Sequence, residues 1–448
     1  MGATSEIGSD QRIAGQACDV LVIGGGPAGS TAAALLAQRG HRVTLVEKAR
    51  HPRFHIGESL LPANLPLFER LGVAEQVRAI GMDKWGAEFV SPWHDHTQTF
   101  EFAEAWDKSM PLAYQVRRSD LDAILIRHAA ASGAEVIEGC RVQDVSLHPD
   151  GALVKARHED GRDSTWRARF LIDASGRDTF LGNRLRFKQR NPRHNSSAMY
   201  AHFAGARRHP GRAAGNISIF WFEHGWFWFI PLADGATSVG AVTWPYYTKS
   251  RKGSMEAFFL DTIKLCPPLE DRLRDARLIS QVEATGNYSY LSDRTHGPGY
   301  LLLGDAFAFI DPVFSSGVML AMTSAFAGAE AVDTSLRHPE RSAQAMRRFD
   351  RLMRRGPRVF SWFIYRVTNP TMRDLFMAPR NLLRMKEALL SVLAGDIFGR
   401  TPIWRGVLAF KVVYYLSSLG HLGRTLRAWR RRRRNIRPLD EQEIPVSP

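Results

Sequence analysis

The sequence predicts an α/β fold in which a Rossmann-like dinucleotide-binding domain carries an inserted mixed β-sheet and is followed by a helical C-terminal region. A glycine-rich turn at residues 24–29 lies between an apolar strand and an alanine-rich helix. An apolar strand that ends in Gly-Asp follows near residue 300, and apolar residues recur at helical spacing beyond residue 335. A chain of 448 residues is long enough for two or three such units.

The first unit opens with a strand over residues 18–23, the turn GGGPAG, a helix over residues 30–39 and a strand over residues 41–46. A helix that starts at such a turn presents free amides and a positive dipole to a pyrophosphate. Glycines let the backbone approach this group, and the last glycine permits close packing of the helix on the strand. We therefore assign four turn residues to cofactor binding: Gly24, Gly26, Ala28 and Gly29.

Glu47 ends the second strand, 18 residues after the last glycine of the turn. In a dinucleotide-binding unit a carboxylate at this place accepts hydroxyl groups of the ribose. The glycine motif alone is weak evidence. With the strand before it, the helix after it and Glu47 in place, a dinucleotide site is favoured over a structural turn.

The rest of the chain divides by pattern. Extended apolar segments dominate between residues 195 and 295, and helical spacing dominates after residue 335. We expect the helical part to cover a substrate cavity. The predicted units are a disordered leader at 1–17, the first part of the dinucleotide-binding domain at 18–190, a substrate-side sheet at 195–295, a return segment of the first domain at 300–335, a helical lid at 336–430 and a basic, polar tail at 431–448.

The composition excludes several classes of protein. Apolar residues make up 44% and charged residues 23%, which is typical of a globular chain. The three cysteines, Cys18, Cys140 and Cys266, have no metal-ligand spacing, so neither a disulfide framework nor a metal site is indicated. No signal peptide and no long uncharged apolar run is present. We expect a cytoplasmic protein.

The net charge of +15 is concentrated near the C-terminus. Residues 341–437 hold 23 basic and 4 acidic residues, with the densest run at Arg430–Arg434. Such a run fits a solvated tail, an acidic partner protein or an anionic membrane surface. Of these three, contact with a membrane is the least favoured. A nucleic-acid-binding arm is not expected, because no nucleic-acid recognition fold accompanies the run.

Two further segments indicate which dinucleotide is bound. Leu171–Arg177 reads LIDASGR, and Tyr300–Asp311 reads YLLLGDAFAFID. These motifs resemble the FAD monooxygenases with the para-hydroxybenzoate hydroxylase fold. The resemblance implies an FAD-binding domain in which Gly304 and Asp305 meet the ribityl chain. It also implies flavin contact by Arg118, which as a residue pattern could equally be a surface arginine at a helix start.

Four motifs narrow the resemblance to the flavin-dependent halogenases. They are WFWFIP at Trp226–Pro231, GESLLP at 57–62, KWGAEF from Lys84, and GDAFAFIDPVFSSGV at 304–318. Within that family the spacing and the FSSGV ending are similar to the members that act on phenols and on pyrroles held by carrier proteins. The tryptophan-halogenating branch is a poorer match, because it is longer and carries an acidic residue just before the Ser/Thr-Gly turn.

The resemblance implies the chemistry. Reduced FAD and oxygen would convert chloride or bromide into a hypohalous acid, which passes along a tunnel to a catalytic lysine that matches Lys84. The lysine would hold this acid by hydrogen bonding or become a chloramine, and the sequence leaves both open. The halide would lie at Ser316 and Gly317, although FSSG could also be a simple helix cap.

The remaining site residues also come from the resemblance. Trp226 and Trp228 point to one face of a strand, and with Pro231 they would keep the substrate away from the flavin. Glu58 and Ser59 would lie near the flavin and the tunnel, although Glu58 could instead cap a helix.

The expected partners are a separate NAD(P)H-dependent flavin reductase, since a second glycine motif is absent, and an acyl or peptidyl carrier that holds the substrate. The alternatives are an FAD hydroxylase, a reductase of the geranylgeranyl reductase type, or a non-catalytic flavoprotein. The tryptophan strand together with Lys84 argues against all three.

Overall fold

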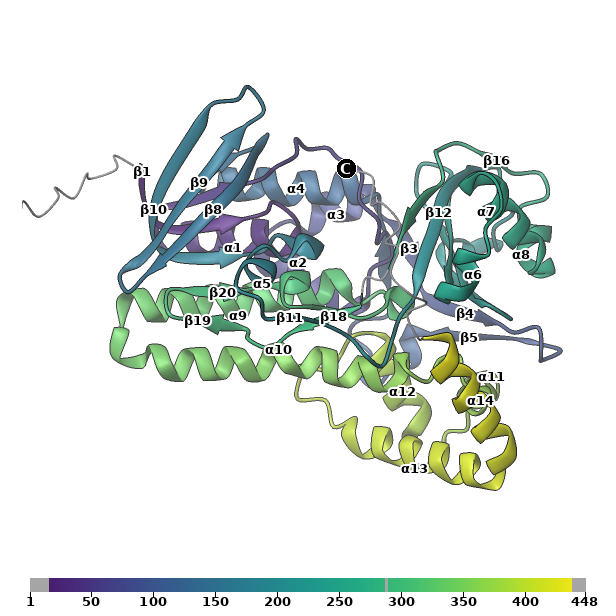
Figure 1. Ribbon diagram of the computed structural model, residues 1–448. Helices are drawn as coiled ribbons and strands as arrows, with labels where there is room; N and C mark the ends of the chain where they lie inside the picture. Colours follow the sequence, from purple (N-terminus) through teal and green to yellow (C-terminus); the bar gives the residue numbers. More distant parts are fainter. Residues whose placement is uncertain (1–15, 287–288, 437–448) are drawn as a thin grey trace, which may run out of the picture.

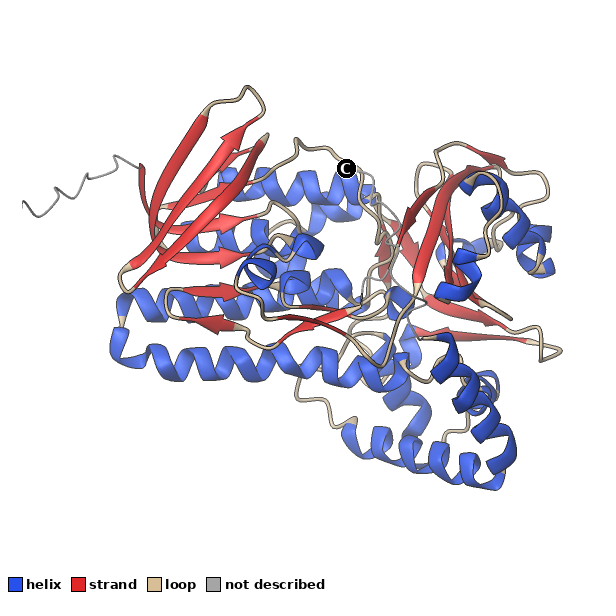
Figure 2. Cartoon of the chain, in the orientation of Figure 1, coloured by secondary structure: helices blue, strands red, loops and turns tan. Residues whose placement is uncertain are grey.

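The computed structural model describes residues 16–286 and 289–436 (Figure 1). Most of the predicted leader lies outside these residues, but Gln16 and Ala17 already belong to the first strand. Helices and strands form two regions; two long helices lie beneath the first, and shorter C-terminal helices lie beneath the second (Figure 2). No helix among the described residues is long and apolar enough to cross a membrane.

The first region is built on a sheet with the strand order β19-β20-β10-β1-β2-β7. The strands from β20 to β7 pair in parallel, and β8 and β9 add an antiparallel ribbon to β10. The central strands are apolar and buried on both faces, as parallel strands require. Their bounds are β1 Gln16–Ile23, β2 Val43–Val46, β7 Glu135–Ile137, β8 Cys140–His148, β9 Gly151–His158, β10 Asp163–Asp173, β19 His296–Gly297 and β20 Tyr300–Leu302.

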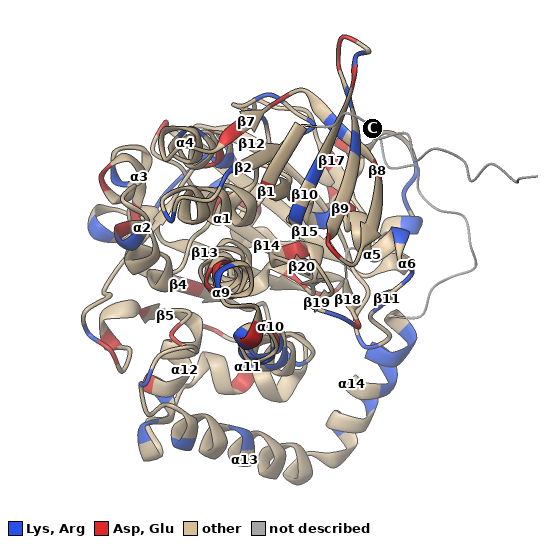
Figure 3. Ribbon diagram, turned by 90° about the vertical axis from the view of Figure 1, so that its left-hand side faces the viewer, with Lys and Arg blue, Asp and Glu red and all other residues tan. Residues whose placement is uncertain are grey.

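Helices α1, α4 and α9 lie together on one side of this sheet, and the β8–β9 ribbon lies on the other side (Figure 3). Helix α1 packs against α4 and α9, and α10 runs along α9 as the base of the molecule (Figure 1). Residues 342–364 form one continuous helix, α10, with Pro357 in its interior. The helices of this region are α1 Pro27–Ala37, α2 Leu65–Leu71, α3 Ala74–Ile80, α4 Arg118–Ala131, α5 Phe180–Arg184, α9 Gly317–Arg337 and α10 Ser342–Ile364.

The second region is a sheet with the order β16-β12-β15-β14-β13-β4-β5, and β17 also pairs with β12. The prediction placed this sheet within 195–295, but β4 and β5 come from within the predicted 18–190 unit. Strand β4 pairs in parallel with β13, some 130 residues later in the chain. The bounds are β4 Gly86–Val90, β5 Thr97–Glu101, β12 Ser197–Ala204, β13 Ile217–Phe222, β14 Gly225–Pro231, β15 Ala236–Thr243, β16 Arg277–Leu278 and β17 Glu283–Thr285.

Alternation along the strands gives the second sheet two apolar faces. On β14, Trp226 and Trp228 face the C-terminal helices, whereas Phe227 and Phe229 face the small helices on the other side. Those helices are α6 Pro245–Lys249, α7 Met255–Lys264 and α8 Pro267–Arg272. Two minor sheets join the regions: β3 Met82–Lys84 with β6 Ala113–Gln115, and β11 Lys188–Arg190 with β18 Tyr290–Ser292 and β21 Ala308–Phe309.

The helical C-terminal region comprises α11 Pro370–Met377, α12 Met385–Leu393, α13 Trp404–Gly420 and α14 Leu422–Asn435. The predicted boundary at residue 431 is wrong, because Arg430–Arg434 continues α14 and is not a separate tail. Much of the ribbon of this helix is coloured as Lys or Arg in Figure 3. The rest of the predicted tail, from residue 437, lies outside the described residues.

Candidate active site

A central cavity lies between the glycine turn of the first sheet and the inner face of the second. Ten of the sixteen predicted site residues line it, from segments as far apart in the chain as Gly26 and Gly317. They are Gly26, Ala28, Glu58, Ser59, Arg118, Trp226, Trp228, Asp305, Ser316 and Gly317. The six that do not line it are Gly24, Gly29, Glu47, Lys84, Pro231 and Gly304.

The glycines of the turn have different tasks. Gly24 has a φ of +100°, and a Cβ atom there would lie 2.5 Å from the carbonyl oxygen of Ala174. A Cβ on Gly29 would lie 1.9 Å from the carbonyl oxygen of Gly24. These two glycines thus allow backbone to pack on backbone. Only Gly26, whose Cβ would meet nothing closer than 3.9 Å, is open toward the cavity.

Glu47 lies at the end of β2, next to the turn. Its Oε2 accepts a hydrogen bond of 2.6 Å from the Gly25 amide, and its Oε1 accepts one of 2.9 Å from the Ala49 amide. The Arg53 guanidinium lies 3.7 Å from the same carboxylate. The carboxylate therefore holds the glycine turn in place, and ribose binding by Glu47 stays a prediction.

Arg118 begins helix α4 and is buried. Its guanidinium donates hydrogen bonds of 2.9 and 3.0 Å to Asp122 and one of 3.0 Å to the carbonyl oxygen of Ile56. Burial opposes ionisation of Asp122, but the charge and hydrogen bonds of Arg118 outweigh it and lower the pKa of that carboxyl. The result is a rigid, ion-paired wall, unlike the free surface arginine of the alternative interpretation.

Asp305 faces the cavity from the end of β20. Its carboxylate accepts no hydrogen bond from any described residue. Loss of hydration on burial raises the pKa of Asp305 to about 6, although the positive charges of Arg177 and Arg118 act to lower it. A carboxylate in this state is ready to accept hydroxyl donors from a ligand.

These features fit FAD. An open glycine at a helix start suits a pyrophosphate, and the unpartnered Asp305 suits the hydroxyl groups of a ribityl chain. The Gly304 backbone, at φ +52°, approaches α9 closely enough that a Cβ would lie 3.2 Å from Ala321. Gly304 thus brings Asp305 to the cavity and need not touch the ligand.

The turn at residues 315–317, the predicted anion-binding turn, lines the cavity at the start of α9. Ser315 adopts a left-handed conformation with φ 54°, and Ser316 and Gly317 then begin the 21-residue helix α9. The first amides of a helix have no intrahelical acceptor, and the helix dipole favours an anion there. The Ser316 side chain does not cap the helix, so FSSG is not a simple side-chain cap.

The tryptophan strand forms another wall. Trp226 and Trp228 lie side by side with ring centroids 6.1 Å apart, and Trp228 donates a hydrogen bond of 3.2 Å to the Ser238 hydroxyl. Gly240 on β15 leaves room for the Trp228 ring, since a Cβ there would lie 2.2 Å from it. Pro231 is buried but follows the opposite face by alternation, so Ile230 takes its predicted place at the cavity.

Lys84 is the most unusual side chain near this site. It ends β3, is 1% exposed, and donates hydrogen bonds of 2.9 Å to the Ser59 hydroxyl and to the carbonyl oxygen of Leu60. Burial lowers the pKa of Lys84 from 10.5 to about 7. Because Ser59 lines the cavity and Lys84 does not, the amine lies one side chain behind the wall.

The structure also reveals two buried histidine pairs that sequence spacing did not nominate. His202 Nε2 lies 3.0 Å from both carboxylate oxygens of Glu58, which excludes the helix-cap interpretation of this acid. His194 Nε2 lies 2.8 Å from Asp311, whose other oxygen accepts the Val313 amide just before the anion-binding turn. The only sequence signal was alternation, which places His202 on the same strand face as Tyr200.

Comparison with known proteins agrees with this arrangement. A family model described as an FAD binding domain matches residues 17–340. The tryptophan 2-halogenase of Chondromyces crocatus is 36% identical over 70% of this chain, and the match spans 60% of that protein. A 1H-pyrrole-2-carbonyl-(peptidyl-carrier protein) chlorinase of Pseudomonas fluorescens is 30% identical over 85% of this chain and 89% of its own.

A solved structure shares the whole architecture. The myxobacterial chondrochloren halogenase CndH matches with a TM-score of 0.74 and 32% identity, over 90% of this chain and 97% of its own. The FAD-binding domain and relatives this similar over most of both chains lead to one conclusion: the protein is an enzyme of the flavin-dependent halogenase family.

Proposed function

We propose that the enzyme chlorinates an electron-rich aromatic compound, either a phenol or a pyrrole tethered to a carrier protein, and that Lys84 delivers the halogen. The observation that carries this proposal is the buried amine of Lys84, held behind Ser59 with its pKa lowered to about 7. The relatives support the substrate class, since one acts on a carrier-bound pyrrole and is named a chlorinase.

Reduced FAD, when bound, supplies with oxygen the oxidising power that turns the halide into an electrophile. The residues of this chain do the rest. The amides at Ser316 and Gly317 bind the halide, and the indoles of Trp226 and Trp228 separate the substrate from the flavin. Glu58 and His202 fix the loop that carries Ser59, so that the hydroxyl stays between the cavity and Lys84.

The hydrogen bonds of Lys84 favour the chloramine route over hydrogen bonding alone. A neutral amine has two N–H donors, and the structure offers it two acceptors, the Ser59 hydroxyl and the Leu60 carbonyl. The nitrogen lone pair is then left free to bond an electrophilic halogen.

The exposed face of α13 and α14 suits a carrier. Leu416, Leu419 and Leu422 are 62%, 65% and 52% exposed, and arginines flank them on α14. A surface with an apolar centre and a basic rim fits an acidic partner protein.

The first prediction concerns the lysine. We expect Lys84→Ala to lose halogenation while FAD binding and oxygen consumption stay near wild type, because the amine lies away from the glycine turn. Product measured by mass spectrometry and FAD affinity measured by fluorescence test this, with exposed Lys155→Ala as the control. Lys84→Met keeps the volume of the side chain. If either Lys84 variant keeps more than about a tenth of the wild-type rate, a difference of ~1.4 kcal/mol in barrier, the assigned role is wrong.

The second prediction concerns pH. The folded protein releases the Lys84 proton near pH 7, whereas the unfolded chain holds it until about pH 10.5. Between these values the unfolded state binds more protons, so raising the pH favours the folded state. In denaturant titrations wild type should gain stability relative to Lys84→Met across this window, by up to ~1.4 kcal/mol per pH unit.

If the neutral amine of Lys84 is the active form, its deprotonation should also change the rate of halogenation. The rate of halogenation with excess reduced FAD should rise with an apparent pKa near 7. A rate that falls through pH 7, with the stability difference present, would show that the ammonium form is the active one.

The third prediction concerns the source of electrons. We propose that a separate flavin reductase supplies reduced FAD, so NADH and NADPH alone should leave bound FAD oxidised in a stopped-flow experiment. Adding a flavin reductase should start turnover. Rapid bleaching of FAD by a nicotinamide without that reductase would instead favour a hydroxylase-like enzyme.

The fourth prediction concerns the carrier. The arginine run is not uniform, because Arg432 points into the protein and the other four side chains are exposed. We expect the Gln variant of Arg430, Arg431, Arg433 and Arg434 to reduce kcat/KM at least tenfold for a carrier-tethered substrate at low salt. The effect should vanish at high salt and be absent for the same aromatic acid free in solution. If the wild type and the Gln variant are equally active on tethered substrates at low salt, the carrier does not dock on this surface.

A further inference from the structure

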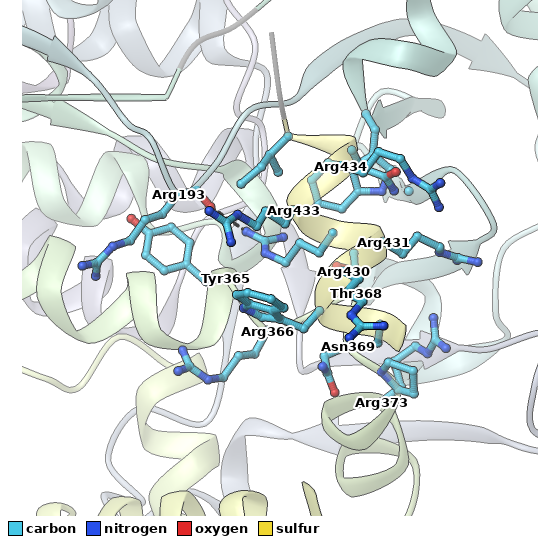
Figure 4. Close-up of a pocket in the computed structure, with 18 of the residues that line it drawn as sticks. Arg193, Tyr365, Arg366, Thr368, Asn369, Arg373, Arg430, Arg431, Arg433 and Arg434 are labelled. Carbon is cyan, nitrogen blue, oxygen red and sulfur yellow. Dashed lines mark hydrogen bonds between the residues drawn. The ribbon is translucent and has the colours of Figure 1, made fainter. Parts of the chain in front are cut away.

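A second and larger cavity, of about 1400 Å³, lies between helix α14 and the body of the protein. We call it the arginine cavity. It is lined by eleven arginines and by a single carboxylate, Glu223. Figure 4 shows these side chains around α14, with Arg193, Tyr365 and Arg366 on the left of the helix in this view.

Most of these arginines have no ion-pair partner among the described residues. Of the eleven, only Arg424 forms an ion pair with a carboxylate in the described part of the chain, through Asp374 at 2.7 Å. Asp311 of the central cavity attracts Arg432 without forming an ion pair with it, so most of the like charges in the arginine cavity still repel one another. An anion in the arginine cavity would remove the repulsion.

Two of the guanidinium groups are also buried with an N–H unsatisfied. Nη1 of Arg432 and Nε of Arg373, the latter side chain 8% exposed, are buried and have no hydrogen-bond partner among the described residues. Burial lowers the pKa of each of these arginines to about 10. Buried donors without acceptors are costly in a folded protein, so each position is one where a ligand oxygen would stabilise the structure.

Aromatic rings hold the guanidinium groups in place. Arg432 lies over Trp244 and Tyr365, with 5.3 and 5.9 Å to the ring centroids, and it donates a 2.9 Å hydrogen bond to the carbonyl oxygen of Arg193. Arg366 lies 4.5 Å over the ring of Trp362. Stacking on an aromatic ring fixes the orientation of a guanidinium group. Its N–H groups can then donate two parallel hydrogen bonds to the oxygens of a phosphate.

We propose that the arginine cavity is a binding site for a phosphate ester, held by Arg432 and Arg366. The site lies outside the central cavity and uses none of the residues assigned to FAD, halide or Lys84. No part of this step depends on halogenation.

The position of the cavity indicates which phosphate ester it takes. A small hollow lined by His194 separates the two cavities; it shares Trp244 and Thr368 with the arginine cavity, and it shares Trp226 and Asp311 with the central cavity. A phosphate held at Arg432 therefore lies on one side of the residues around His194, and the central cavity with its tryptophan strand lies on the other side of them. A phosphopantetheine arm, whose phosphate is followed by a long flexible chain to the acyl group, fits this arrangement. This second step rests on the proposed function.

The test is a binding experiment on the FAD-loaded protein, so that probes cannot occupy the glycine turn. Tryptophan fluorescence and calorimetry would be used at low salt with phosphopantetheine, pantetheine, AMP and inorganic phosphate. We expect phosphopantetheine to bind at least tenfold more tightly than pantetheine, and inorganic phosphate to compete with it. The double variant Arg366→Gln/Arg432→Gln should abolish this difference.

Controls separate the site from net charge and from misfolding. Arg167→Gln/Arg251→Gln removes two exposed positive charges elsewhere and should bind as wild type does. Arg432→Lys keeps the positive charge but loses the planar guanidinium that can donate two parallel hydrogen bonds to a phosphate. This variant should bind phosphopantetheine several-fold more weakly, with an unchanged melting temperature. The titration is repeated with D440N/E441Q/E443Q, which removes the three carboxylates that follow α14 in the sequence.

The outcomes are distinct. If no phosphorylated probe binds the wild type or D440N/E441Q/E443Q more tightly than pantetheine, the phosphate site is overturned whatever the enzyme halogenates. If AMP binds as tightly as phosphopantetheine, the phosphate site stands and the assignment to a carrier arm is overturned. Because no turnover is measured, a failed halogenation assay leaves these results unchanged.

Discussion

The close approach of backbone segments at the ends of β1, β10 and β20 is the constraint on which the central cavity depends. Gly24 packs on the carbonyl of Ala174, and Gly29 packs on Gly24 in turn. Gly304 then brings the end of β20 against α9. Because no side chain separates these segments, the starts of α1 and α9 reach the same cavity, and their free amides can serve two different anions.

That packing brings several distant segments to one cavity. The glycine turn, Asp305, the predicted anion-binding turn at the start of α9 and the two tryptophans all line it. Lys84 is kept dry behind Ser59, and its lowered pKa is a consequence of complete burial without a carboxylate partner. The Lys84 amine is thereby separated from bulk water by ordinary packing.

Short-range patterns in the sequence predicted the strand, glycine turn and helix that the structure has at residues 16–37, and they predicted the shared face of Trp226 and Trp228, which it also has. Each of these depends on residues that are close together in the chain. Pairings between distant segments could not be predicted. Glu58 and His202 are 144 residues apart, and strands β4 and β5 join a sheet whose remaining strands begin at residue 197.

The arginine run shows the same limit. As a sequence, Arg430–Arg434 is uniform and was predicted to be part of a tail. In the structure α14 turns one of its members, Arg432, toward Trp244 and leaves the others in solvent. Burial within a helix depends on what lies beside it, and that contact, with Arg193 some 240 residues away, has no local signal.

The path of the chain has a consequence for how such enzymes diversify. The second sheet takes strands from 86–101 and from 197–285, and the first sheet is completed only when the chain returns at β20. An exchange of the second sheet between homologues would therefore require several crossovers at matching positions. The helices after residue 370 follow both sheets as one uninterrupted segment and can be exchanged by a single recombination event. The C-terminal helices can thus be replaced more readily than the second sheet, which forms the inner wall of the cavity.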